Sequence, residues 1–197
     1  MRLALAQINA VVGDLEGNRE RILAAVADAR SANAELVLLP ELAVTGYPPE
    51  DLLLRPAFVR AAEESTRAIA AACTGITALV GTPWSFDAGL ANVCAVCADG
   101  EIQALYRKRL LPNYGVFEEA RYFQPGADPL ALPVGGLSVG LTVCEDIWQP
   151  GPAADLAAAG AELLVNISAS PFHVGKAEER EAMLAGRARD NGFPLAF

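Results

Sequence analysis

Hydrophobic positions along the chain alternate between short continuous runs and longer segments with a helical period. The continuous runs predict strands over residues 2–8, 35–39, 76–81, 137–144 and 162–168. Helices are expected where apolar side chains recur every three or four positions, over residues 19–33, 56–73, 153–159 and 177–191. We expect Asn18 to cap the first helix and Pro56 to lie in the first turn of the second, because both residue types favour helix starts.

The segment over residues 91–107 has the pattern of a β-hairpin. Asp99-Gly100 separates two apolar runs, and this dipeptide suits a two-residue turn. Residues 112–136 carry Pro, Gly, Asn and aromatic residues without a period, so we expect a long loop, which is often functional. Strands, helices and a hairpin together predict an α/β layered fold. The chain ends in FPLAF, which has the pattern of a further strand, so the natural domain is expected to continue.

Composition narrows the class of protein. With 197 residues, 53% of them hydrophobic, the chain is long enough for one domain with a substantial core. Its 15 basic and 24 acidic residues give a net charge of -9, which disfavours binding to nucleic acid or to an anionic membrane. The apolar run at the N-terminus is too short for a membrane span and lacks the flanks of a signal peptide. We therefore expect a cytoplasmic protein, whose four cysteines are free thiols.

Three chemically active side chains follow directly after predicted strands: Glu41, Lys108 and Cys144. Side chains at strand ends of an α/β fold can converge in one crevice. A carboxylate, an ammonium and a thiol at one point suffice for acyl transfer, because a nearby base and cation activate the thiol. Taken singly, each residue also fits an ordinary role, as a loop carboxylate, one charge in a basic run, and a small buried side chain.

Other candidate residues and motifs give weaker support for a catalytic or binding role. Cys94 and Cys97 have the spacing of half a zinc site or a redox pair, but there is no second pair and they lie in a predicted strand, so packing is favoured. His173 is the only histidine and ranks second as a catalytic base. Neither a GxGxxG nor a GxxxxGK[ST] motif occurs, so we expect no ATP site, cofactor or metal in this chain.

Four segments resemble known catalytic segments. The stretches around the three candidates, LLPELAVTGYPPEDLL, YRKRLLPNYGVFEEARYF and VGLTVCEDIW, resemble those of the nitrilase superfamily of carbon-nitrogen hydrolases, and NISASPFHVGK adds a fourth match. Within it, GYPPEDLL, LPNYGVFEEARYF and CEDIW are similar to the glutaminase domains of glutamine-dependent NAD synthetases. The resemblance implies a nitrilase-like αββα four-layer sandwich over residues 1–197 that lacks its C-terminal part. It also implies that ATP and Mg²⁺ belong to an absent synthetase domain.

The resemblance also assigns roles. Glu41 would accept the proton of Cys144, whose sulfur attacks the side-chain amide of glutamine, while Lys108 stabilises the oxyanion. Glu119 would bind the substrate amino group and Lys176 its carboxylate, although Glu118 leaves the register open by one residue. The positions implied for glutamine binding are Tyr47, Tyr114, Phe117, Glu119, Ser170 and Lys176. Leu110 stands where many members of the superfamily have a histidine.

Three interpretations stay open. The first is a glutaminase module that supplies ammonia to a synthetase domain for amidation of deamido-NAD, within a homo-oligomer. The second is a free-standing amidase acting on another small amide. The third is a catalytically silent fragment used for binding or assembly.

Overall fold

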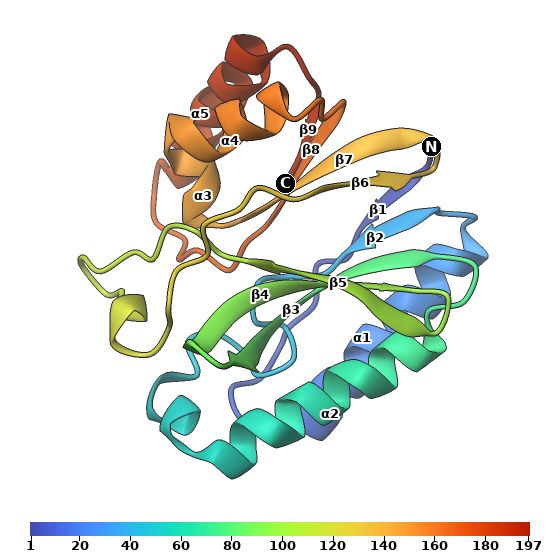
Figure 1. Ribbon diagram of the computed structural model, residues 1–197, viewed down its shortest axis with the longest axis vertical. Coiled ribbons are helices and arrows are strands. Elements are labelled where there is room, and N and C mark those ends of the chain that lie inside the picture. The colour runs from blue at the N-terminus through green and yellow to red at the C-terminus, as the bar shows by residue number, and fades with distance from the viewer.

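Two β-sheets pack face to face in the computed structural model, which describes residues 1–197 (Figure 1). The first sheet has the order β1-β2-β3-β4-β5 and the second the order β6-β7-β8-β9. Strands β1 to β3 are parallel and β3 to β5 antiparallel; β6 and β7 are antiparallel, and β7 to β9 parallel. The strands are β1 Leu3–Leu5, β2 Leu36–Leu38, β3 Thr77–Phe86, β4 Gly89–Ala98, β5 Glu101–Arg107, β6 Ala131–Val134, β7 Leu137–Val143, β8 Leu163–Ile167 and β9 Leu195–Ala196.

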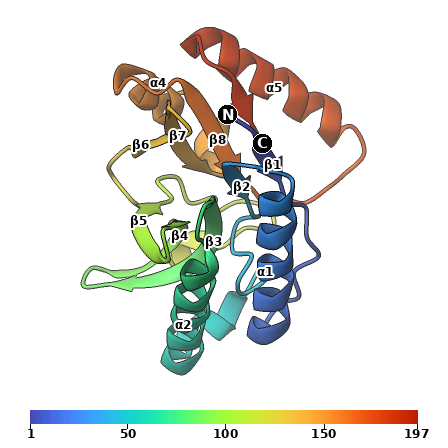
Figure 2. The ribbon, with the colours of Figure 1, turned by 90° about the vertical axis from the view of Figure 1, so that its right-hand side faces the viewer.

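Helices cover the outer face of each sheet (Figure 2). The first sheet carries α1 and α2, and the second carries α3, α4 and α5. The helices are α1 Leu15–Ser31, α2 Pro56–Ala72, α3 Glu145–Trp148, α4 Pro150–Ala158 and α5 Lys176–Asn191, with 3-10 turns at Glu50–Leu54 and Glu119–Arg121. This layering confirms the predicted αββα sandwich. None of the helices combines the length and the apolar character needed to cross a membrane.

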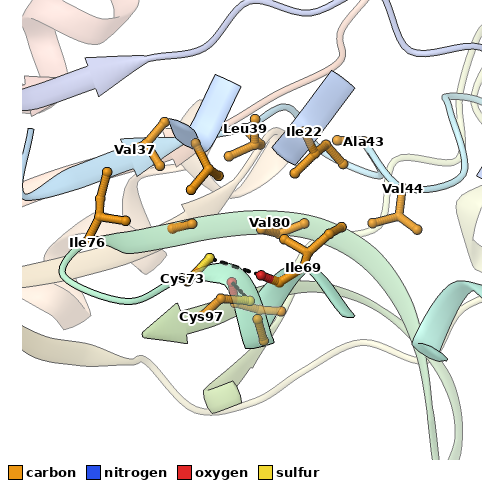
Figure 3. Close-up of a cluster of buried hydrophobic side chains, with 14 of the residues drawn as sticks. Ile22, Val37, Leu39, Ala43, Val44, Ile69, Cys73, Ile76, Val80 and Cys97 are labelled. Carbon is orange, nitrogen blue, oxygen red and sulfur yellow. Dashed lines mark hydrogen bonds between the residues drawn. The ribbon is translucent and has the colours of Figure 1, made fainter. Parts of the chain in front are cut away.

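Three apolar layers separate the four structural layers. Under α1 and α2, side chains such as Ile22, Ile69 and Val80 form the first (Figure 3). The second lies between the sheets, and the third lies beneath α4 and α5. The middle layer holds the two sheets together by burying apolar surface from both, which fixes how their strand ends meet.

The first helix starts earlier than predicted. It begins at Leu15, because Asp14 caps it by accepting a hydrogen bond from the backbone N-H of Gly17 at 2.9 Å. The prediction of Asn18 as the cap was therefore wrong. Asn18 is fully buried, and its side-chain amide donates to the carbonyl oxygens of Val11 and Val44 at 2.8 and 3.1 Å. It thus ties α1 to the turn that carries Glu41.

The predicted hairpin is present, with Asp99 and Gly100 at positive φ of 53° and 83° in the turn between β4 and β5. The strand predicted over residues 76–81 continues to Phe86, because a second hairpin joins it to β4. The segment of residues 112–136, predicted as a loop, contains strand β6, which pairs antiparallel with β7; the pattern did not predict this strand.

A glycine in β3 lets the turn after β2 pack directly on the sheet. A Cβ at Gly81 would overlap the backbone of Pro40 and Leu42. Leu42 has a φ of 48°, which side chains rarely adopt, so this turn has little freedom to move away. Gly81 therefore fixes the backbone position of Glu41 relative to the sheet.

We predict that Gly81→Ala lowers the free energy of unfolding by about 1 to 3 kcal/mol, because the added methyl group overpacks rigid backbone. Gly186→Ala is the matched control, since Gly186 lies in α5 with open space at its Cβ position. It is expected to stabilise the protein by up to about 1 kcal/mol through helix propensity. Urea unfolding of both variants measures the effect, and equal midpoints would contradict it.

Candidate active site

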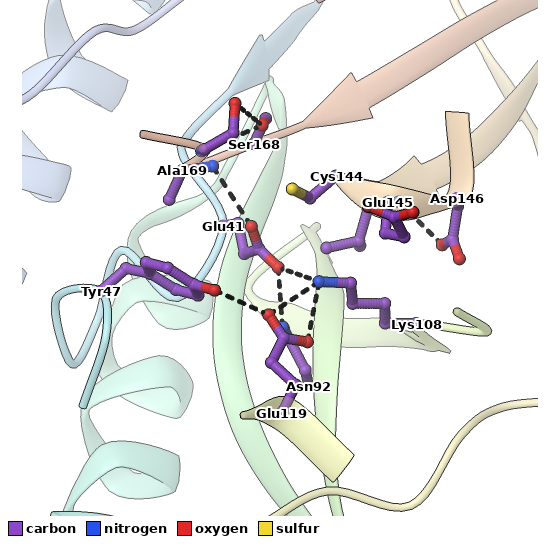
Figure 4. Close-up of polar contacts among 12 residues, drawn as sticks. Glu41, Tyr47, Asn92, Lys108, Glu119, Cys144, Glu145, Asp146, Ser168 and Ala169 are labelled. Carbon is purple, nitrogen blue, oxygen red and sulfur yellow. Dashed lines mark hydrogen bonds and ion pairs between the residues drawn. The ribbon is translucent and has the colours of Figure 1, made fainter. Parts of the chain in front are cut away.

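The structure brings Glu41, Lys108 and Cys144 together at the strand ends of the two sheets (Figure 4). Glu41 lies in the turn after β2, Lys108 follows β5, and Cys144 follows β7. Their exposed fractions are 1%, 0% and 3%, so the three side chains share a site closed to bulk water.

Lys108 is the centre of a buried ionic network. Its Nζ donates to Glu41 Oε1 at 2.7 Å and to the two oxygens of Glu119 at 2.9 and 2.8 Å. The hydroxyl of Tyr47 donates to Glu119 at 3.0 Å. Burial opposes the charged form of Lys108, but the nearby carboxylates outweigh it and raise the pKa of its ammonium. Glu119, from the 3-10 turn, is thus a fourth member of the network.

Asn92, which the sequence analysis did not single out, holds the base and the cation at once. Its side-chain amide donates to Glu41 Oε1 at 2.8 Å, and its backbone carbonyl accepts from Lys108 N at 2.9 Å. The other oxygen of Glu41 accepts from the backbone N-H of Ala169 at 3.2 Å. The sequence signal that could have identified Asn92 was its polar amide side chain within an otherwise apolar strand.

Cys144 occupies a strained turn between β7 and α3. Its φ of 45° and ψ of -102° are uncommon for a residue with a side chain, and such strain costs of the order of 1 to 3 kcal/mol. Its backbone N-H donates to the carbonyl of Ile167 at 2.9 Å, which holds the turn against β8. The sulfur points toward the side where Glu41 and Lys108 meet (Figure 4).

The charges of the site determine how the thiol can react. Burial and the Glu41 carboxylate raise the pKa of the Cys144 thiol, against the opposing effect of Lys108. With two carboxylates and one ammonium, the buried cluster already carries one net negative charge. Loss of the thiol proton to solvent would add a second, whereas its transfer to Glu41 leaves the net charge unchanged. The arrangement therefore favours a thiol that ionises only as Glu41 takes its proton.

The aromatic residues predicted to bind substrate lie beside this cluster. The rings of Tyr114 and Phe117 meet edge to face with centroids 5.5 Å apart. The hydroxyl of Tyr114 donates to Glu145 Oε2 at 2.8 Å. Glu145 follows the nucleophile directly, and the sequence analysis did not single it out. Lys108 engages both oxygens of Glu119. Glu145 instead accepts its hydrogen bond from the exposed Tyr114.

Ser170 and Lys176 lie on the segment after β8, and their contacts fall outside the Lys108 network. The hydroxyl of Ser170 accepts from Arg180 Nη2 at 3.1 Å. The ammonium of Lys176 lies 3.9 Å from the ring centroid of Trp148 and 3.3 Å from a carboxylate oxygen of Glu179. Ser170 and Arg180 also line a cavity of about 430 Å³ between β1 and β8.

The remaining candidates stand apart from the cluster. His173 is exposed, and its ring contacts the carbonyl of Val174. Cys94 packs in the layer between the sheets, while Cys97 packs in the layer beneath α1 and α2. Their sulfurs therefore lie on opposite faces of one sheet, and burial raises the pKa of both thiols.

A sequence profile of the carbon-nitrogen hydrolase family matches residues 2–197, so the chain belongs to this family. Within it, the chain matches one portion of longer enzymes. It is 46% identical over 200 residues to the glutamine-dependent NAD(+) synthetase of Xylella fastidiosa and 43% identical over 201 residues to that of Thermotoga maritima. These alignments cover 100% of the chain but only 37% and 35% of the relatives.

Solved structures include both synthetases and amidases. The glutamine-dependent NAD+ synthetase of Acinetobacter baumannii superposes with a TM-score of 0.95 at 32% identity, over 99% of this chain and 37% of that one. An amidase from Nesterenkonia sp. superposes with a TM-score of 0.85 at 32% identity, over 100% of this chain and 77% of that one. In that amidase, acrylamide has added to the active-site cysteine.

We predict that Glu119→Gln weakens the pH dependence of stability. Burial and the Glu41 carboxylate raise the pKa of Glu119 above its usual 4.5. A raised carboxyl pKa stabilises the fold fully below pH 4.5, and this contribution is lost as pH rises through the folded-state value. Replacing the carboxyl group removes that loss.

Glu118→Gln is the control, because Glu118 is an exposed neighbour whose partner is Arg121. Urea unfolding at several pH values from 5 to 8 gives the free energies. The same pH slope in both variants would contradict the prediction.

Proposed function

We propose that this chain hydrolyses the side-chain amide of glutamine and delivers ammonia for the amidation of deamido-NAD. The observation that carries the proposal is the buried contact of Lys108 with Glu41 beside the strained turn of Cys144. A base, a cation and a nucleophile held at one closed point are the groups that acyl transfer requires.

In the first half of the reaction, Glu41 accepts the proton of Cys144 as the sulfur attacks the amide carbon. The π electrons of the carbonyl move to oxygen, which becomes the oxyanion of a tetrahedral intermediate. When the intermediate collapses, the C-N bond breaks, and the nitrogen takes the proton held by Glu41 and leaves as ammonia. A glutamyl thioester on Cys144 remains.

In the second half, Glu41 takes a proton from water, whose oxygen attacks the thioester carbon. The C-S bond of the second tetrahedral intermediate breaks, and the sulfur of Cys144 regains the proton from Glu41. Glutamate leaves, and the site returns to its starting charge. Each proton thus moves between neighbouring groups within the closed site.

Lys108 stabilises the oxyanion in both halves. Glu119 and Glu41 fix its ammonium before substrate arrives, so little reorganisation accompanies the build-up of negative charge. Removing one such preorganised donor costs roughly 3 to 4 kcal/mol of transition-state stabilisation in comparable enzymes. The backbone N-H that follows Cys144 supplies a second donor.

Recognition of the amino-acid end falls to the exposed side of the site. Glu145 carries a carboxylate next to the nucleophile and is oriented by Tyr114 at 2.8 Å, so it suits the α-ammonium of glutamine. We therefore propose Glu145 as a contact of the amino group, because Lys108 already binds the oxygens of Glu119. The assignment of Glu119 to the amino group stays a prediction. Ser170 and Lys176 are the proposed contacts of the α-carboxylate.

The ammonia is proposed to reach a synthetase domain that binds ATP and Mg²⁺, within a cytoplasmic homo-oligomer. The support is the similarity to full-length NAD(+) synthetases, of which the chain spans little more than a third.

A free-standing amidase acting on another small amide is the second candidate. It is supported by the Nesterenkonia sp. amidase, of which the chain covers 77%. Such an enzyme would turn over simple amides as readily as glutamine, whereas the proposed glutaminase would prefer a substrate with an α-ammonium group.

We expect a glutamine-derived diazoketone to add once to Cys144, because attack by its sulfur expels dinitrogen and leaves a stable bond. Intact mass of the unmutated chain and of Cys144→Ala measures the adduct. Cys94→Ala is the matched control, since Cys94 is as deeply buried but lies in the core. An adduct that persists in Cys144→Ala, or none on the folded chain, would overturn the proposal.

We also expect Glu145→Gln to raise KM for glutamine at least tenfold, because one charge-assisted contact of about 1.5 to 3 kcal/mol is lost. KM for propionamide, which has no α-ammonium group, should change little. Glu118→Gln serves as a control for removal of a nearby exposed carboxylate. Equal changes in KM for the two amides would assign Glu145 a general rather than a specific role.

A further inference from the structure

Besides Glu41 and Glu119, the molecule buries a third carboxylate close to Cys144. Asp146 is 0% exposed and lies in α3, two residues after Cys144. A buried carboxylate is expected to have a cation partner, yet Asp146 forms no ion pair within 4.0 Å. An apolar residue of similar size would avoid the desolvation of a charge, so the carboxylate needs a reason to be there.

Its two oxygens accept four hydrogen bonds. Oδ1 accepts from the backbone N-H groups of Arg109 and Leu110 at 3.1 and 2.8 Å. Oδ2 accepts from the hydroxyl of Tyr106 at 2.8 Å and from the backbone N-H of Val143 at 3.0 Å. The three backbone groups can only donate, so both oxygens must act as acceptors.

These partners bracket the two catalytic side chains that come from different sheets. Tyr106 and Arg109 lie on either side of Lys108, at the end of β5 in the first sheet. Val143 precedes Cys144, at the end of β7 in the second sheet. The bond from Val143 also closes the strained turn around the nucleophile, so one carboxylate fixes both the turn and its distance from the lysine.

We propose that Asp146 is a positioning residue that clamps the end of β5 to the nucleophile turn and so sets the placement of Lys108 relative to Cys144. This inference rests on the proposed function, because it assigns Asp146 to the same reaction. Asp146 does not touch the substrate; it acts through the backbone on either side of the two catalytic residues.

The test is Asp146→Asn, which keeps the volume but presents an NH₂ group to at least one backbone N-H. We expect glutamine turnover, as kcat, to fall about 100-fold, the loss that a misplacement of about 1 Å causes. Alkylation of Cys144 by iodoacetamide, located by peptide mass spectrometry, should fall in parallel, since the reagent needs no amino-acid contacts. KM for glutamine should change much less than kcat.

The control is Asp155→Asn, which removes the exposed side-chain partner of Arg109, 2.7 Å away, and leaves the backbone clamp intact. It should keep both rates within about twofold. If Asp146→Asn does not fold, Tyr106→Phe is the second variant. It removes one of the four hydrogen bonds to Asp146 and keeps the aromatic ring in the core. We expect it to lower both rates about tenfold, in line with loss of one bond to a charged group.

Rates in Asp146→Asn within threefold of the unmutated chain would overturn the inference. So would a loss that disappears at a lower temperature at which the variant is fully folded, because Asp146 would then serve stability alone. Failure of the proposed function looks different: the unmutated chain itself would neither hydrolyse glutamine nor be alkylated at Cys144.

Discussion

The structure depends on one interaction, the contact of a fully buried ammonium with two carboxylates. Taking an ion out of water costs several kcal/mol, and only a fixed set of opposite charges and hydrogen bonds compensates it. Lys108 has that set in Glu41 and Glu119, with Asn92 as a further tie. Glu41 follows β2, Asn92 lies in β4 and Glu119 lies in the loop after β5, so these parts of the first sheet and its loop must keep one relative position. The apolar layer that covers the inner face of this sheet supports this rigidity.

Two strained turns present the side chains of Glu41 and Cys144. Leu42, next to Glu41, has a φ of 48°, and Cys144 has a φ of 45°. Neither conformation is favourable by itself, and a buried polar side chain holds each turn: Asn18 bonds to the first and Asp146 closes the second. The strain is therefore balanced locally, at the two places where the chain must leave a strand abruptly to aim a side chain into the crevice.

Apolar periods predicted an α/β layered fold, and the predicted strand ends indicated where the three reactive side chains meet; the four layers were implied by the family resemblance. The sequence could not indicate the residues that hold these side chains. Asn92 and Asp146 bond to residues that are distant in sequence, such as Glu41 and Leu110, and that come close only when the fold forms. Glu119 was predicted as a substrate contact, but its contact with Lys108 depends on the path of an aperiodic loop.

The buried ionic network and the loop residues proposed for recognition occupy different parts of this site, which is consistent with its similarity to both synthetases and amidases. The ionic network is buried and built on strand ends, so it is compatible with any small amide that reaches it. The loop residues proposed to bind substrate lie outside this network; Tyr114, for example, is 59% exposed. Loops change at little cost to the core, so a common catalytic centre fits both an amidase and a synthetase. The proposed specificity for an amino acid rests on a few charges, such as that of Glu145, outside the buried network.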